Sequence, residues 1–302
     1  MKKIKCPLCN TSAFTILYPS TLKPKDFDPK VIKNNLKNTL DDYSKHAQIV
    51  RCVNCDLVYT NPMEDMKKIL QGYGDVVDKE YLKTEKFRKL LSLKHLAILE
   101  KFKTKGQMLD IGCFAGFFLE LSKSKGWKTY GIEPSQWASK IARDRGVTIV
   151  GRDIERSKLK SNFFDVITMW DVIEHLPNPQ TVIKIIHKAL KKNGIVAFGT
   201  PNIEGLLAKV LKNHYPYLIR MHIILYSPKT LKKLFEENGF RVIHKETYGR
   251  IYPLEYILAR IKFNNKVFQY IKTTILSHRK IANITIPLNL RDEFVMIAQK
   301  VT

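Results

Sequence analysis

The chain has 302 residues, of which 44% are hydrophobic, and this is enough for one full α/β domain with a smaller module beside it. No apolar run approaches the roughly 18 residues of a membrane span, and the start MKKIKCPLC carries charge without a following apolar stretch, so we expect neither a span nor a signal peptide and take the cytoplasm as the default location. The formal charge of +24 is spread along the chain, which fits either a solvated basic surface or an anionic partner such as RNA, a nucleotide-activated substrate or an anionic lipid surface.

Two C-x-x-C pairs open the chain, Cys6 with Cys9 and Cys52 with Cys55. In a chain without a secretion signal, such pairs favour a tetrahedral four-cysteine zinc site over disulfides. Redox-active dithiols and a metal-free module are the alternatives. The insert between the pairs is longer than in most zinc ribbons, and 29–43 within it is a candidate hairpin or helix.

A short strand follows the second pair and reads Asp56-Leu-Val-Tyr-Thr-Asn-Pro62, where the proline ends it. Apolar residues at helical spacing then predict a helix over 79–102, next to the first strand of the main domain. This helix, with Tyr73 and Tyr81 before or at its start, either covers a ligand or serves as a plain linker.

The stretch from Gln107 to Pro134 organises the rest of the chain. It predicts a buried strand at 108–111, a glycine turn, a helix from Phe117 that stops at Gly126, and a second strand at 128–132. Backbone amides at the helix start suit a carboxylate, and Glu133 at the end of the second strand can accept hydrogen bonds from two ribose hydroxyls. The ligand is therefore either a dinucleotide or S-adenosylmethionine.

The dinucleotide fingerprint G-x-G-x-x-G is missing. Asp110-x-Gly112-x-x-x-Gly116 instead resembles motif I of the class I S-adenosylmethionine-dependent methyltransferases, with Phe114 in place of the usual middle glycine. The ribbon ending "C-x-L-V-Y-x-N-P" and the stretch from Phe164 to Pro179 are similar to those of bacterial and archaeal members, many of which act in sugar and glycan pathways.

The resemblance implies a methyl-donor site built from four strand ends. Motif I and the end of the second strand would hold the amino-acid and ribose parts, and later strand ends would contact the adenine and line the pocket. In chain order these residues are Asp110, Gly112, Cys113, Phe114, Gly116, Glu133, Pro134, Asp153, Ile154, Trp170 and Asp171. Cys113 itself reads as a small packing residue and not as a nucleophile.

Asp171, Glu174 and His175 would share one face if their turn is helical, either as a clamp that holds the loop or as a divalent-metal site. Further on, the stretch from His222 to Leu231 resembles the family element "H-x-x-x-F/Y-S-x-x-T-L". His175, His222 and Tyr226 are the candidate general bases, and each has a structural role as its alternative.

The remaining pattern predicts strands at 148–150, 164–171, 195–198, 241–248 and 293–300, and helices at 135–145, 181–190 and from Pro228 to Glu237. The stretch 252–281 is basic and aromatic and is expected to be helical, as a substrate cap, a dimer surface or a membrane-surface helix. A cap is the interpretation we carry forward.

We therefore expect a Rossmann-like seven-stranded α/β methyltransferase sheet with a small N-terminal zinc-ribbon module. The predicted division is a ribbon at 1–62, a connecting segment at 63–105 and the methyltransferase domain at 106–302, with 251–285 as the candidate cap. The predicted reaction is O- or C-methylation of a small-molecule, nucleotide-sugar or glycan acceptor. The alternatives are an rRNA or tRNA base methyltransferase, which is not favoured, and a non-catalytic zinc-ribbon binding protein.

Overall fold

The computed structural model describes residues 1–28, 31–32, 45–65, 73–248, 250–254, 266–278, 284–288 and 291–301. Its largest sheet has the strand order β10-β13-β8-β7-β4-β5-β6. In chain order these strands are β4 (Gln107–Ile111), β5 (Lys128–Ile132), β6 (Thr148–Gly151), β7 (Phe164–Trp170), β8 (Leu190–Pro201), β10 (Phe240–Thr247) and β13 (Glu293–Lys300). The predicted seven-stranded α/β sheet is confirmed.

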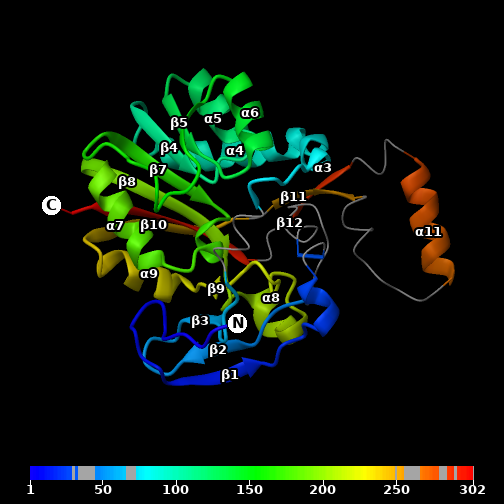
Figure 1. Cartoon of the computed structure of the whole chain (residues 1–302). Coiled ribbons are helices and arrows are strands. Elements are labelled where there is room, and N and C mark those ends of the chain that lie inside the picture. Colours follow the sequence, from blue (N-terminus) through cyan, green and yellow to red (C-terminus); the bar gives the residue numbers. More distant parts are fainter. Residues whose placement is uncertain are drawn as a thin grey trace.

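The five strands β4 to β8 run parallel, and β13 is antiparallel to both of its neighbours, β8 and β10. Helices cover both faces, as Figure 1 shows, with α4 to α6 on one side and α7 and α9 on the other. Alternate residues of the central strand β7 enter different cores, since Val166 packs on the first side and Ile167 and Met169 pack on the second. The sheet is thus buried on both faces, as a doubly wound fold requires.

The helices begin where the sequence offers caps. Ser135 accepts a hydrogen bond from the backbone N–H of Ala138 at the start of α6, and Ser227 and Thr230 form a capping box at the start of α9. The described helices of the main body are α3 (Lys79–Lys83), α4 (Glu85–Glu100), α5 (Phe117–Ser124), α6 (Gln136–Asp144), α7 (Pro179–Ala189), α8 (Leu206–Leu211) and α9 (Pro228–Glu236), with 3-10 turns η1 (Pro24–Phe27), η2 (Ile173–His175) and η3 (Lys212–His214).

Two boundaries differ from the prediction. The single helix expected over 79–102 is two helices, α3 and α4, which meet at Thr84 because its backbone leaves the helical region there. Strand β8 begins at Leu190 and not at Ile195, because the basic stretch after α7 already extends alongside Phe164 of β7. The apolar pattern detects only the buried half of that strand.

The N-terminal residues form a second sheet, β1-β2-β3-β9. Strands β1 (Phe14–Tyr18), β2 (Ile49–Cys52) and β3 (Val58–Thr60) belong to the ribbon, whereas β9 (Ile224–Leu225) comes from the residues before α9. In Figure 1 strands β1 to β3 of this sheet lie below α9. The division at 62 and 105 stays a proposal, and this shared sheet ties the first and last of the proposed units together.

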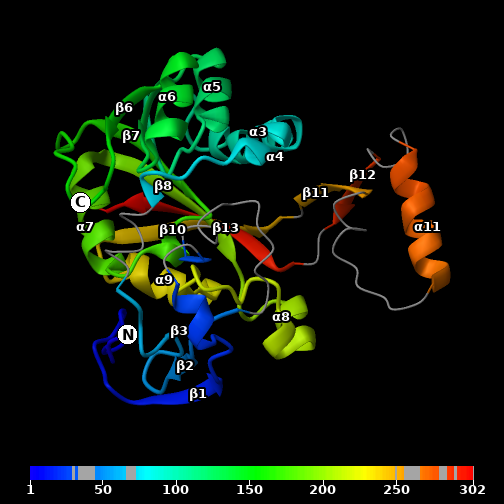
Figure 2. The same ribbon diagram turned by 45° about the vertical axis from the view of Figure 1, so that its right-hand side comes forward.

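A separate pair of strands follows β10 and extends away from the main sheet. β11 (Arg250–Pro253) pairs antiparallel with β12 (Thr285–Leu288), and α11 (Lys266–Ser277) lies beyond them. Figures 1 and 2 both show α11 standing apart from the seven-stranded sheet. The prediction of continuous helix over 252–281 is therefore wrong at its start, where the chain pairs as a strand. Of the predicted element at 29–43, all but Val31 and Ile32 lies outside the described residues. Within the described ranges we find no helix with the length and apolar character that crossing a bilayer requires.

Candidate active site

Two glycines shape the turn after β4. Gly112 and Gly116 both have a φ of 78°, in the left-handed region that other residues rarely adopt. A Cβ atom at Gly112 would lie 2.5 Å from Val172 Cγ2, and one at Gly116 would lie 3.0 Å from the Cβ atom of Ala142. Both positions therefore require glycine, and the turn brings its backbone to the carboxyl edge of the sheet, where α5 begins.

Phe114 stands in the middle of this turn with a left-handed φ of 45°. Its ring is buried, and its centroid lies 4.0 Å from that of Tyr81 and 6.0 Å from that of Trp137. Aromatic packing of this kind offsets the cost of the left-handed backbone. This explains how a residue other than glycine occupies the middle of the motif.

The carboxylate of Glu133 lies at the end of β5 and is only 1% exposed. The backbone N–H of Phe114 donates to its Oε2 at 2.9 Å, and the N–H of Ser135 donates to its Oε1 at 2.8 Å. Burial raises the pKa of Glu133 to about 7, against the lowering effect of these two donors and of Arg152. Each carboxylate oxygen has a second lone pair, so both oxygens can accept a further hydrogen bond from a ligand.

Asp110 lies on β4 beside this site. Thr168 Oγ1 of β7 donates to its Oδ1 at 2.7 Å. Burial, with a smaller contribution from the charge of Glu133, raises the pKa of Asp110 to about 7, although the Thr168 hydroxyl opposes the shift. Two buried acids thus meet at the carboxyl ends of neighbouring strands, where α/β sheets bind their ligands.

Residues 73–83, here called the cover segment, pack over the glycine turn. The N–H of Gln136 donates to the carbonyl of Gly74 at 3.1 Å, and Ser135 Oγ donates to the carbonyl of Val76 at 2.9 Å. Tyr81 lies against Phe114, and the guanidinium of Arg88 lies 3.4 Å from the centre of the Tyr81 ring. These contacts favour a covering role for the segment over that of a plain linker.

The remaining residues of the predicted donor site make packing contacts or local hydrogen bonds. Cys113 is buried, with its Sγ against Gly131, in agreement with a packing role. Arg152 donates to the carbonyl of Pro134 at 2.8 Å. Asp153 has a half-exposed carboxylate that caps its own turn by accepting from the N–H of Glu155, and the neighbouring Ile154 is buried.

Trp170 and Asp171 follow the end of β7. The Trp170 ring stacks on His95 of α4 with centroids 3.9 Å apart, and its buried Nε1 has no hydrogen-bond partner among the described residues. Asp171 has a φ of 53°, and its N–H donates to the carbonyl of Gly199 at 2.9 Å. The indole N–H is therefore available to a ligand near the carboxyl edge.

The turn η2 begins after Asp171, so Asp171 does not share a helical face with Glu174 and His175 as the prediction required. The structure groups Glu174 and His175 with His222 instead, with potential ligand atoms within 4.8 Å of one another. The carbonyl of Met221 lies 2.8 Å from His175 Nδ1, and that of Tyr217 lies 2.9 Å from His222 Nδ1. A carbonyl only accepts, so Nδ1 of each ring donates in these contacts. Burial lowers the pKa of His175, and the backbone and the charge of Asp171 act in the opposite direction.

Tyr226 follows β9 and is buried, and its hydroxyl has no hydrogen-bond partner among the residues that the structure describes. Burial, with smaller contributions from Glu174 and Cys6, holds the pKa of Tyr226 well above its ordinary value. The phenol therefore stays protonated near neutral pH, which makes it a hydrogen-bond donor and a poor general base.

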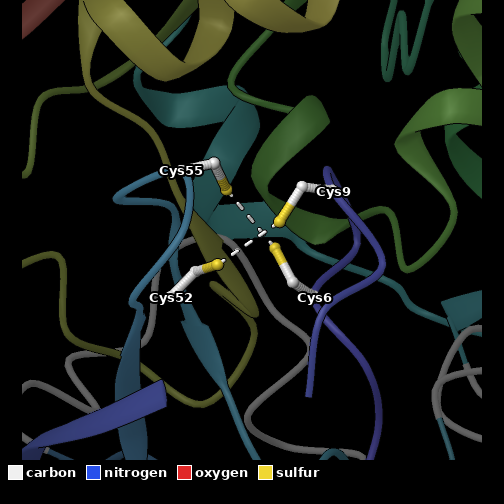
Figure 3. A group of neighbouring side chains, drawn as sticks. All are labelled: Cys6, Cys9, Cys52 and Cys55. Carbon is white, nitrogen blue, oxygen red and sulfur yellow. Dashed lines mark hydrogen bonds between the residues drawn. The ribbon is translucent and has the colours of Figure 1, made fainter. Parts of the chain in front are cut away.

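The four cysteines of the N-terminal module converge, as Figure 3 shows. The sulfur atoms of Cys6 and Cys55 are 3.5 Å apart and those of Cys9 and Cys52 are 3.4 Å apart, with all four thiols free. A tetrahedral zinc site with bonds of about 2.3 Å places its sulfurs about 3.8 Å apart. Burial, with a further contribution from the neighbouring thiols, raises the pKa of Cys55. A cation bound between the four sulfurs would offset the charge of their thiolates. The donor set fits zinc.

Comparison with known proteins identifies one family and solved structures of the same fold. A family described as "Methyltransferase domain" matches residues 82–245, more than half of the chain. A crystal structure of an S-adenosylmethionine-dependent methyltransferase from Archaeoglobus fulgidus is 26% identical, with a TM-score of 0.51 over 74% of this chain and 100% of that one. One from Thermotoga maritima is 21% identical, with a TM-score of 0.50 over 74% and 95% of the two chains, and shows the fold alone.

Curated relatives match a shorter part of the chain. The "Ubiquinone biosynthesis O-methyltransferase" of Pectobacterium atrosepticum is 34% identical over 103 residues, which are 32% of this chain. The match spans 43% of that relative's length.

The seven-stranded sheet, its glycine turn and the acid that ends β5 define the fold class of the S-adenosylmethionine-dependent methyltransferases. The chain belongs to the methyltransferase family that matches residues 82–245. Sequence reasoning found the turn and both acids, but it missed Thr168, Ser135 and Val172 as their partners. These partners come from separate strands and loops and carry no motif of their own.

Proposed function

We propose that this protein binds S-adenosylmethionine at the carboxyl edge of its sheet and transfers the methyl group to a hydroxyl oxygen of a small-molecule acceptor. The observation that carries the proposal is the buried Glu133 carboxylate, held by the amides of Phe114 and Ser135 beside a turn that requires glycine. Family membership supports the reaction class, and the O-methyltransferase relatives support oxygen over carbon as the acceptor atom. The sugar or glycan acceptor that the sequence resemblance implies has no support from these comparisons.

The donor site follows from the residues in place. The turn from Gly112 to Gly116 leads into the N-terminus of α5, whose dipole favours a ligand carboxylate, and Glu133 accepts from the ribose diol. Half-exposed Asp153 and buried Ile154 border the adenine. S-adenosylmethionine, when bound, supplies a methyl group on a positively charged sulfur that is already activated for displacement. The protein's task is therefore to hold the acceptor in line and to exclude water.

On the acceptor side, His175 and His222 are the candidate bases. Each ring is fixed by a carbonyl at Nδ1, and the lowered pKa keeps His175 neutral near pH 7. A neutral imidazole takes the hydroxyl proton at Nε2 as the acceptor oxygen forms its bond to the methyl carbon and the bond from that carbon to sulfur breaks. Tyr226 and the Trp170 N–H are donors that would orient the acceptor.

The cluster of Glu174, His175 and His222 also has the donor chemistry of a divalent-metal site. Both imidazoles donate Nδ1–H to carbonyls, and this fits a metal site as well as a clamp that fixes the loop, because metal-bound histidines are commonly oriented in the same way. We further propose that Cys6, Cys9, Cys52 and Cys55 bind structural zinc, which would add stability to the ribbon and take no part in the chemistry.

Calorimetry with S-adenosylmethionine and its demethylated product tests the donor site first. Methyl transfer to catechols and hydroxyquinols, compared with nucleotide-linked keto-sugars and with RNA, then tests the acceptor. We expect micromolar binding and turnover of a phenolic hydroxyl. If neither nucleoside binds at millimolar concentration and Glu133→Ala leaves the calorimetric signal unchanged, the proposed function is wrong. Turnover of RNA alone, or of a sugar alone, would instead replace the phenolic hydroxyl as the proposed acceptor.

A further inference from the structure

Helix α8 is apolar on two sides. Its inner side, with buried Ala208 and half-buried Leu207 and Leu211, packs against the ribbon sheet through Ile49, Val58 and Leu225. Its outer side presents Leu206 and Val210, which are 66% and 67% exposed. These two residues are four positions apart and so lie side by side on one face of the helix. A helix that packs one apolar side on the protein and exposes a second apolar side to solvent indicates a surface that something covers.

The surroundings of that face are basic. Lys209 and Lys212 are exposed beside the two apolar residues, and 205–214 contains no acid. The second element on this side of the sheet is the arm, defined as the described residues 254, 266–278 and 284. These residues include two lysines and no acid, and eight of them are large aliphatic or aromatic ones. Within the arm, Tyr270 of α11 is 73% exposed and Ile284 is 52% exposed.

Both elements leave the sheet at its carboxyl edge, since α8 follows β8 and the arm follows β10 through β11. Figure 2 shows α8 and α11 on the side of the molecule toward which those strands point, with α11 clear of the body. A helix that stands clear of the sheet and exposes Tyr270 is poorly placed to be a substrate cap. It is well placed to lie against an extended surface.

We propose that the outer side of α8 and the arm dock this protein on an anionic lipid bilayer. Apolar side chains flanked by lysine, with almost no acid nearby, match a surface that is apolar inside and negatively charged at its headgroups. RNA would use the charges and leave Leu206 and Val210 exposed to water, and a second copy of this basic chain would bring like charges together.

One consequence rests on the proposed function. The candidate bases follow β7 and precede α9, on the same carboxyl edge, so a docked enzyme would meet acceptors held in the membrane surface. Vesicle binding does not need turnover, so failure of the proposed reaction and failure of docking are distinguishable.

The test is co-sedimentation of the full chain with vesicles of equal parts phosphatidylglycerol and phosphatidylcholine, and with phosphatidylcholine alone, at low and high salt. We expect retention on the anionic vesicles that salt weakens. The double change L206E and V210E should reduce the bound fraction by about tenfold or more, since it removes two apolar anchors and adds repulsion. Leu93→Glu is the matched control, an exposed leucine at 44% on α4, and should leave retention unchanged.

S-adenosylmethionine affinity checks that each variant is folded. If the double variant does not fold, Tyr270→Glu on the separate α11 should still lower retention severalfold. Equal loss with Leu93→Glu, no retention at low salt, or equal retention on uncharged vesicles would overturn docking. So would a wild-type dimer that the double variant converts to monomer, because a second copy would then cover the face.

Discussion

At the scale of single residues, the buried acid at the end of β5 decides whether the donor site works. Glu133 is held by two backbone amides and keeps two acceptor positions. Charge-assisted hydrogen bonds of this kind contribute about 1.5–3 kcal/mol each. We therefore expect Glu133→Gln to weaken S-adenosylmethionine binding by at least about tenfold in calorimetry. Glu236→Gln, an exposed acid on α9, is the control, and equal affinity in both variants would contradict this role.

The same acid gives the unliganded protein an unusual response to pH. The pKa of Glu133 is raised from 4.5 to about 7, so between these values the folded state holds a proton that the unfolded chain has lost. Its contribution to stability is complete below about pH 4.5 and is lost as pH rises through 7, which amounts to about 3 kcal/mol at 1.4 kcal/mol per pH unit. The raised pKa of Asp110 acts in the same direction.

Thermal unfolding from pH 5 to pH 8 checks this prediction. We expect the wild-type melting temperature to fall over this range relative to that of Glu133→Gln, which cannot titrate at this site. The ion-paired acids Glu85 and Glu120 have lowered pKa values, so their effects fall in a more acidic window. Parallel pH profiles for the two proteins would show that the folded state does not hold this proton.

Residue types were enough to predict the donor site proposed here, because its chemistry is local: Asp110, Gly112, Gly116 and Glu133 fall within one strand-turn-helix-strand unit. The conformation of Phe114 could not be predicted in the same way. Its left-handed backbone depends on packing against Tyr81 and Trp137, which lie on other elements. The grouping of His222 with Glu174 was missed for the same reason, because β9 brings together residues far apart in the chain.

At the scale of elements, the ribbon and the acceptor side share a hydrogen-bonded path. Thr60 at the end of β3 donates its N–H to the carbonyl of Ile223 at 2.9 Å, and the N–H of Ile223 donates to the carbonyl of Glu174 at 2.9 Å. His222 and Tyr226 flank the short strand β9 that β3 holds. A strand of two residues has no periodic pattern, so the sequence could not predict this junction.

Loss of the metal should therefore damage turnover more than donor binding. We expect Cys52→Ser, or removal of zinc by a chelator, to lower turnover by about tenfold or more while S-adenosylmethionine affinity stays within about twofold. Metal content by mass spectrometry, calorimetry and methyl transfer measure the three quantities. Val53→Ser, at an exposed position in the same knuckle, is the control. Full turnover in the metal-free protein, or equal loss of turnover and of S-adenosylmethionine affinity, would contradict a specific link between the ribbon and the acceptor side.

At the scale of the whole molecule, the described structure is closed over the proposed donor site. Glu133 is 1% exposed and Phe114 is 4% exposed, because the cover segment lies over the turn between them. The charged cluster of Glu85, Lys89, Glu120 and Arg145 fixes α4, which follows this segment, to α5 and to the end of α6. We therefore expect a ligand to reach the turn by movement of the shorter α3 part while α4 stays in place.

Hydrogen exchange tests directly whether the α3 part of the cover segment moves while α4 stays in place. We expect S-adenosylmethionine to slow exchange at 73–84 and to leave the amides of β2 unchanged, because binding closes the cover and does not reach the ribbon. Removing the ring that contacts Phe114 by Tyr81→Ala should raise the dissociation rate of the ligand by about tenfold, with a smaller change in its association rate. Tyr270→Ala removes an exposed tyrosine far from the turn and serves as the control. Unchanged rates in Tyr81→Ala, with no protection at 73–84, would mean that the ligand enters from the acceptor side, past Trp170, and that the cover segment is fixed in place.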